Sequence, residues 1–528
     1  MKRRSFIKRA GGAAAAAGAG VFAILKYPRG ANAAGWGAWP KDKIDAFLPV
    51  EMQARSVLEL HVNGGMSAFD TFYTVPSWGQ GENRFLYVMD EGAPWVTATG
   101  DPSNSIQGRF DECTGGGENL TVPFDAEDAN GVGIHLGPWL YPFRSRPDVL
   151  NRMRIVVTAH EQAAHEGANP VSFTGLRLGN PRMAGIGTAI QRYFNENPDA
   201  PGGGGFRAAP YSYVLYPEGY KPFNAVAASS VGSHPGSARP LVVSVEPNSE
   251  LSQLLARSAL ENPQGFDQAV AYYRAEYESR LRAFGHSAPA RSAERDSYEF
   301  ASFAREHAPE LTNILSSDLF APIDPPNTVC TVAQNGDDMP AMQARMAASL
   351  LTRNNNAARY VLWIDAGLNP STTGGHDTHN FSVSLNGINY PHTFQALLDV
   401  IATPEQAGTP GLIDLDETMV IINTEFGRTP EPQGYPGSPT LGTNHHPEGY
   451  VQVFIGGPIQ GRSVYGAMRE ADGFADGTFA RPAQARMMAL QAMGIYPFSS
   501  QSYNVAEANS TDEEEAALLI RDLLGVEV

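Results

Sequence analysis

Cysteine is almost absent from this chain, which has only Cys113 and Cys330 among its 528 residues. Two thiols are too few for a framework of several disulfides or for a metal site built from thiolates. In an oxidising compartment the two could pair with each other, and the sequence leaves this pairing open.

Basic side chains and long apolar runs are also scarce. The chain has 38 Lys and Arg against 56 Asp and Glu, a formal net charge of −18. An acidic surface repels phosphate backbones and anionic lipid, so neither nucleic acid nor a membrane surface is an expected partner. Beyond the N-terminal region no segment approaches the length of an uncharged bilayer span, so no membrane span is expected in the mature protein.

The first 33 residues have the pattern of a twin-arginine export signal. Arg3 and Arg4 are followed by SFIK, a weakly apolar Ala/Gly stretch and small residues at 31–33 that suit a cleavage site. Cleavage removes seven basic and no acidic residues, which leaves 31 against 56 and a net charge of −25. The expected location is the periplasm or the extracellular space. An uncleaved signal that acts as an anchor is the alternative.

Residues 34–528 are expected to form a single α/β domain. Most predicted strands are continuous apolar runs, typical of strands covered on both faces, and they alternate with helical patterns. This order predicts a doubly wound, mostly parallel sheet between helices. The predicted strands are 56–62, 154–158, 211–215, 240–245, 360–364, 418–422 and 450–455. The predicted helices are 183–194, 266–284, 292–315, 339–352, 392–401 and 483–493.

Two insertions interrupt the alternation. Residues 80–147 are rich in Gly, Pro, Asp and Asn and are expected to form a loop-rich excursion near the site. Residues 262–315 are predicted to form a helical hairpin, a possible cap or homodimer surface. The C-terminal segment is predicted to be a helix capped by Ser510 or Thr511 and ended by Gly525.

Seven of the twelve histidines lie in four polar loops next to predicted strands. Three of these loops follow a strand and the fourth precedes one. Because the carboxyl ends of parallel strands lie at one sheet edge, these imidazoles could gather there with Asp70, Asp377 and Glu425 around metal ions. The seven are His61, His160, His165, His376, His379, His445 and His446.

Each motif also has a plainer interpretation. GGHDTHN could be a hydrogen-bonded surface turn, and Glu425 and Arg428 of TEFGR could form a simple salt bridge. Adjacent histidines usually point apart, so at most one of His445 and His446 is an easy ligand for a given ion. The sequence does not decide whether His376 or His446 is a ligand.

Several of these motifs occur in a known order. The signal peptide, NGGMSAFDTF, HDTH, TEFGR and GTNH resemble the twin-arginine-exported family called domain of unknown function 1501. That family belongs to the alkaline phosphatase and sulfatase superfamily. The resemblance spans nearly the whole mature chain and implies an alkaline phosphatase-like fold with one or two metals. Zinc is the first choice of divalent ion, with manganese or calcium as alternatives. The implied ligand sets are Asp377, His379 and His445 for one metal, and Glu425 with Asn63 or Asp70 for another.

The chain departs from the superfamily at the nucleophile. The Thr-Gly-Arg-like segment is represented by Thr174, Gly175 and Arg177, but the place of the usual Ser, Thr or modified Cys is taken by His165. No Cys-x-Pro-x-Arg occurs, which disfavours formylglycine sulfatase chemistry. His165 could attack phosphorus, ligate a metal that activates water, or mark a lineage that kept the fold and lost the reaction.

Two hypotheses result from these observations. The first is an exported metallohydrolase of small phosphate or sulfate esters, with His165 as nucleophile or ligand and Arg428 or Arg177 holding the anion. The second is a non-catalytic exported protein that binds a metal or an anionic glycan, or serves in envelope assembly. The natural substrate, the metal count and the oligomeric state do not follow from the sequence.

Overall fold

A computed structural model describes most of the chain after the N-terminal region. The chain divides into two units, Met1–Gly35 and Trp36–Val528, and every described helix and strand belongs to the second. The predicted export signal lies outside the described residues. These are 35–41, 46–79, 85, 105–180, 182, 184–197, 200, 211–217, 241–245, 263–283, 313–326, 330, 336–354, 357–368, 375–433 and 442–526.

The centre of this unit is an eight-stranded sheet in the order β12-β4-β11-β8-β1-β7-β5-β6. All seven predicted strands are present in it, and only the short edge strand β12 was not predicted. The continuous apolar runs identified them because both faces of the sheet are covered. The bounds are β1 Ser56–Val62, β4 Met153–Thr158, β5 Tyr213–Pro217, β6 Leu241–Val245, β7 Tyr360–Asp365, β8 Thr418–Asn423, β11 Tyr450–Gly456 and β12 Ser463–Tyr465.

One strand, β11, runs against the others. It pairs antiparallel with both β4 and β8, whereas the other strand pairs of this sheet are parallel. The start of β11 therefore lies at the edge where the parallel strands end. Because β11 is antiparallel, the loop that precedes it lies at the same sheet edge as the loops that follow β4 and β7.

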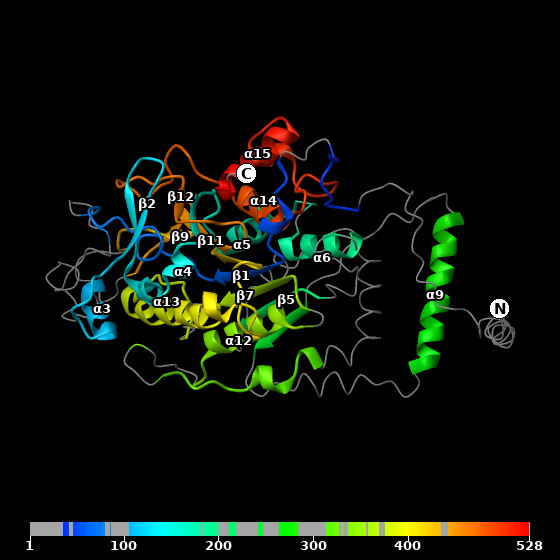
Figure 1. Ribbon diagram of the computed structural model, residues 1–528, viewed down its shortest axis with the longest axis horizontal. Coiled ribbons are helices and arrows are strands. Elements are labelled where there is room, and N and C mark those ends of the chain that lie inside the picture. The colour runs from blue at the N-terminus through cyan, green and yellow to red at the C-terminus, as the bar shows by residue number, and fades with distance from the viewer. Residues whose placement is uncertain are drawn as a thin grey trace. The chain divides into compact units, whose positions relative to one another are not determined.

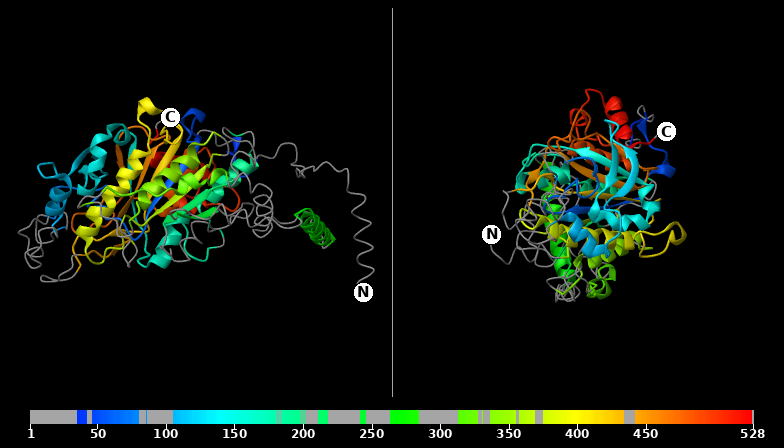
Figure 2. Two further views of the ribbon diagram at one scale, coloured as in Figure 1. Left: turned by 90° about the horizontal axis from the view of Figure 1, so that it is seen from below. Right: turned by 90° about the vertical axis from the view of Figure 1, so that its left-hand side faces the viewer.

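Helices cover both faces of the sheet (Figure 1). One apolar core packs the sheet against α5, α6, α14 and α15, and a second packs it against α12 and α13. Figure 2 gives two further views of these layers. The fold is therefore mixed α/β with a large, mostly parallel central sheet flanked by helices. The bounds are α5 His165–Thr174, α6 Ile186–Glu196, α12 Met339–Thr352, α13 Ser382–Asp399, α14 Pro482–Ala492 and α15 Glu513–Leu524.

Some local expectations differ from the structure. Helix α5 was not predicted, because Pro170 inside it and polar residues at its start hide the helical pattern. The N-cap of α15 is Asp512, whose side chain accepts from the backbone N–H of Glu514 and Glu515, rather than Ser510 or Thr511. The second correction concerns a helix start, where neighbouring short polar residues offer several equivalent caps.

The two predicted insertions contain regular structure. The segment 80–147 includes helix α3 Ile106–Thr114, the hairpin strands β2 Val122–Glu127 and β3 Gly133–Leu136, and the 3-10 turns η5 Pro138–Ser145. Of the predicted helical hairpin, the first arm is α9 Pro263–Ala283, and most of the second arm lies outside the described residues. Within the part of the chain that is described, no helix has the length and apolar character needed to cross a bilayer.

The two cysteines form a disulfide. Cys113 in α3 bonds to Cys330, across 217 residues of sequence, and the Cys113 sulfur also lies 3.7 Å from the carbonyl oxygen of Gly387 in α13. The bond thus ties α3 into the body of the domain.

We expect Cys113→Ala with Cys330→Ala to lower the free energy of unfolding by about 2–4 kcal/mol, because the unfolded chain regains the freedom that a long closed loop removes. Urea unfolding of the oxidised protein, the reduced protein and the double variant would measure it. Reduction should reproduce the effect of the double variant. Equal stability of all three would contradict this prediction.

Candidate metal centre

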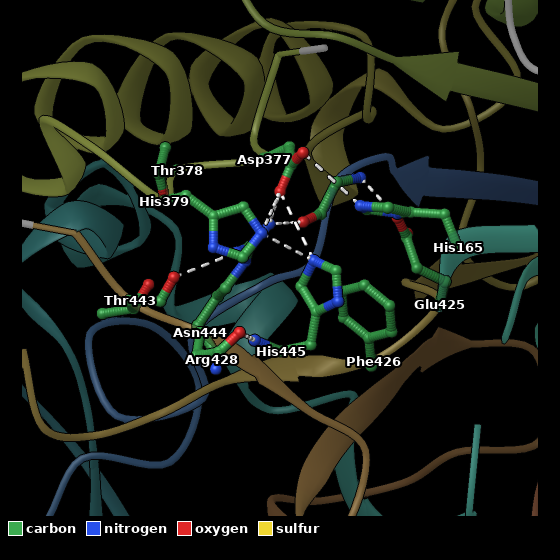
Figure 3. Close-up of polar contacts among 12 residues, drawn as sticks. His165, Asp377, Thr378, His379, Glu425, Phe426, Arg428, Thr443, Asn444 and His445 are labelled. Carbon is green, nitrogen blue, oxygen red and sulfur yellow. Dashed lines mark hydrogen bonds and ion pairs between the residues drawn. The ribbon is translucent and has the colours of Figure 1, made fainter. Parts of the chain in front are cut away.

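Four side chains from distant parts of the sequence meet at the carboxyl edge of the parallel strands (Figure 3). Asp377 and His379 follow β7, His165 opens α5 after β4, and His445 precedes β11. One ligand atom from each of His165, Asp377 and His445 lies within 4.8 Å of the others. We call His165, Asp377, His379 and His445 the cluster.

Each imidazole of the cluster has its Nδ1 held by an oxygen outside the cluster. His165 Nδ1 donates to Glu425 Oε1 at 2.9 Å, and His379 Nδ1 donates to Gln433 Oε1 at 3.3 Å. His445 Nδ1 donates to the carbonyl oxygen of Ala163. In a neutral imidazole this leaves Nε2 with a free electron pair. An oxygen acceptor behind each ring is the usual support of a metal-binding histidine.

The Nε2 atoms face one another and Asp377. His379 Nε2 lies 2.9 Å from His445 Nε2, and these two atoms lie 3.3 and 3.6 Å from Asp377 Oδ1. His165 Nε2 lies 3.4 Å from Asp377 Oδ2. Ligands about 2.0–2.1 Å from a tetrahedral zinc ion are separated by roughly 3.3–3.4 Å, close to most of these distances. The His379 and His445 Nε2 atoms can share one proton at this distance, or both can bind a cation through their electron pairs. The ligand atoms of His165, Asp377 and His445 lie within 4.8 Å of one another and could hold one metal ion, with His379 next to them.

Arg428 forms a hydrogen-bonded ion pair with Asp377. Its guanidinium is fully buried and donates to Asp377 Oδ1, to the Gly64 carbonyl and, at 3.2 Å, to the Thr443 carbonyl. Burial alone would raise the pKa of Asp377, but His165, His445 and Arg428 outweigh it and hold this pKa well below its usual range. Asp377 is therefore an anion at any ordinary pH.

Glu425 lies behind His165 and away from the other cluster residues. Its Oε1 also accepts the backbone N–H of Gly64 at 2.7 Å, and its Oε2 lies 3.3 Å from His61 Nε2. Burial opposes ionisation of Glu425, but His165 and His61 lower its pKa below the usual range. Burial would also lower the pKa of His165, yet Asp377 and Glu425 together raise it to about 9. Glu425 thus orients His165 and increases its basicity.

Two short elements position the histidines. The two-stranded antiparallel sheet of β9 Gly427–Arg428 and β10 His445–His446 places His445 opposite Arg428. The ring of Phe426 stacks on His445, with 4.1 Å between ring centres, and lies 5.0 Å from the ring of His165. The segment TEFGR therefore contributes Glu425 against His165, the ring of Phe426 against His165 and His445, and the buried Arg428 against Asp377.

The structure places several other candidates outside the cluster. Arg177 has a side chain that is 72% exposed and pairs with Glu161 at the surface. His376 bonds to Asp365 at 2.7 Å, and His446 donates to the carbonyl of Gly473 at 3.0 Å. The three predicted members that do come together are Asp377, His379 and His445, joined by His165.

Asn63 and Asp70 lie after β1 and are both buried. The backbone N–H of Asn63 bonds to the Asp365 carbonyl at 3.0 Å, and its own carbonyl accepts from His376. The Asp70 side chain has no hydrogen bond or ion pair with the four cluster residues, all of which are described. Burial raises the pKa of Asp70 to about 7, while a hydrogen bond from Ser67 opposes this rise.

Asp70 gives a pH-dependent prediction. Its folded pKa of about 7 exceeds the unfolded value of 3.8, so its contribution to stability is full below about pH 4 and is lost as the pH rises through 7. The asparagine of Asp70→Asn does not ionise. The free energy of unfolding of this variant relative to the wild type should therefore rise by roughly 2–3 kcal/mol between pH 5 and pH 8. Urea unfolding of both metal-free proteins at the two pH values measures this gap. A gap that stays constant would show that Asp70 ionises normally.

Some supporting groups were not found from the sequence. The Ala163 carbonyl and the Gln433 amide give no signal, because any residue offers a carbonyl and Gln433 lies in an ordinary polar loop. His61 was noticed, but its contact with Glu425 depends on the pairing of β1 with β8. The ion pair of Arg428 with Asp377 was also not predicted.

Fold and cluster together define an α/β protein with a candidate metal centre at the carboxyl edge of its central sheet. Residues 328–494 match the model of a family described as protein of unknown function (DUF1501). The match covers less than half of the chain and supports assignment to this family. It includes Asp377, His379, Glu425, Arg428 and His445, while His165 lies outside it. No curated protein and no solved structure matches the chain.

Proposed function

We propose that this protein is an exported, metal-dependent hydrolase of phosphate or sulfate esters with an alkaline phosphatase-like fold. The observation that carries the proposal is the convergence of three imidazole Nε2 atoms on Asp377, each ring being held from behind by an oxygen. Three nitrogens and one carboxylate oxygen suit zinc, whereas calcium takes oxygen ligands.

The chain's own residues would have separate tasks in this reaction. His379, His445, Asp377 and His165 would hold the ion, Arg428 would keep Asp377 ionised and fixed, and Glu425 would orient His165. A bound zinc ion supplies a water of lowered pKa and polarises the oxyanion of the ester. Hydrolysis adds one water: its oxygen bonds to phosphorus or sulfur, the ester bond to the alcohol oxygen breaks, and the alcohol leaves with a proton.

A second candidate is a non-catalytic exported protein that binds a metal or an anionic glycan at the same site. The specific observation in its favour is that neither predicted anion-binding arginine has its charged group directed at the centre of the cluster. Arg428 is engaged with Asp377 and two carbonyls, and Arg177 pairs with Glu161. Four side-chain ligands would also complete a tetrahedral shell, which is typical of structural zinc sites.

Elemental analysis of the purified protein, combined with a screen of aryl phosphates, phosphodiesters and aryl sulfates, separates the two. The hydrolase predicts about one zinc ion per chain and turnover that a chelator removes and added zinc restores. Because a ligand at about a hundred times its dissociation constant stabilises the folded state by about 2.7 kcal/mol, zinc should also raise the melting temperature. Zinc without turnover would favour the binding role, and no retained metal would exclude the hydrolase and the metal-binding form of the second candidate.

A further inference from the structure

The cluster has an unusual balance of charge. It contains two carboxylates, Glu425 beside His165 and Asp377 beside Arg428, and within the described part of the chain Arg428 is the one guanidinium bonded to Asp377. With neutral imidazoles, as metal binding requires, the group has one formal negative charge. A divalent ion would change this to a single positive charge.

The described loop segments next to the cluster residues add no Lys or Arg. Residues 63–67, 159–164, 366–368, 375–380, 429–433 and 442–444 contain neither, although they contain Glu161 and Glu431. Arg177, which lies beyond the end of α5, is already paired with Glu161 at the surface. Among these described segments no Lys or Arg is available to a substrate anion, so the metal ion would be the positive charge that the anion meets there.

We infer that the metal-loaded site prefers esters whose head group carries one negative charge, namely sulfate monoesters or phosphodiesters, over doubly charged phosphate monoesters. This inference rests on the proposed function. A single negative charge would neutralise the loaded cluster, whereas a second would give it a net negative charge close to the carboxylate of Asp377 and, behind His165, that of Glu425.

Binding can be measured without turnover. Calorimetric titration of the zinc-loaded protein at mildly alkaline pH would compare phenylphosphonate, which is doubly charged there, with its methyl monoester and with benzenesulfonate, which are singly charged. We expect the two singly charged anions to bind about tenfold or more tightly than phenylphosphonate. Equal or tighter binding of phenylphosphonate would overturn the inference, as would binding of none of the three.

A pair of matched variants tests the cause. In Glu425→Gln the amide oxygen can still accept from Gly64 and His165, so the change mainly removes one negative charge. The affinity for phenylphosphonate relative to its methyl monoester should rise by about tenfold at full zinc occupancy. Glu161→Gln, the same change at a residue that is 79% exposed, should leave this ratio within about twofold. An unchanged ratio in Glu425→Gln would overturn the electrostatic explanation.

The two proposals can fail separately. Turnover of an aryl phosphate faster than of an aryl sulfate or an aryl methyl phosphate would keep the hydrolase and overturn the charge preference. The predicted binding order without turnover of any ester would keep the charge preference and overturn the hydrolase. Among the singly charged esters, the faster substrate identifies sulfur or phosphorus as the reacting centre.

Discussion

Asp377→Asn is expected to abolish stoichiometric zinc binding and to lower ester turnover by about 10²–10³-fold or more. The amide keeps the shape of the carboxylate but loses the charge toward which three Nε2 atoms point. It also leaves the buried guanidinium of Arg428 with carbonyl partners only. Zinc content by elemental analysis and turnover of the best aryl ester measure the two effects.

The matched control for this variant is Asp472→Asn. Asp472 is a partly exposed carboxylate that pairs with Arg469 three residues away, and its neutralisation should change neither zinc content nor turnover. A chelator-treated comparison separates metal loss from unfolding: the metal-free variant should also be less stable than the metal-free wild type, because a buried charge has lost its counter-charge. Full zinc content and turnover in Asp377→Asn would refute the proposed centre.

The second large effect is a loss of stability on breaking a buried ion pair in the core. Arg486 of α14 donates to Glu59 of β1 at 2.5 Å, and neither side chain is exposed. Arg486→Met should lower the free energy of unfolding by about 3–5 kcal/mol, because it leaves the Glu59 charge uncompensated in the core. Urea unfolding is the measurement, and the surface change Arg469→Met, expected to cost less than about 1 kcal/mol, is the control.

A double variant distinguishes the effect of the uncompensated Glu59 charge from the effect of lost packing around residue 486. Arg486→Met with Glu59→Gln should recover much of the loss, since the glutamine keeps partners in Tyr360 and Asn423 without an uncompensated charge. The same network reaches the site, because Asn423 ends β8 two residues before Glu425. No recovery in the double variant would assign the loss to packing instead.

The strands of the fold were predictable because their burial is encoded locally. β1, β7 and β8 are unbroken apolar runs covered on both faces, and such runs do not depend on which neighbours they pair with. Helix α12 was predicted with its full bounds, Met339–Thr352, since Asp338 caps its start. Helix α5 was not, because its helical state depends on packing against α14 rather than on its own pattern.

The candidate site was only partly predictable. HDTH and GTNH contain ligand-type residues in polar loops, which made them candidates, and the family resemblance then implied Asp377, His379 and His445 as one ligand set. The position of Glu425 behind His165, and of Arg428 beneath Asp377, depends on contacts across 260 and 51 residues of sequence. No local pattern specifies such partners.

By itself, the sequence determined the layered α/β architecture, the acidic surface and the kinds of ligand available, because burial pattern, charge and side-chain chemistry belong to the residues themselves. Only the tertiary structure decided that β11 runs antiparallel, which brings His445 to the edge where β4 and β7 end. It also decided which nitrogen of each imidazole points inward, because that choice follows from oxygens supplied by distant segments.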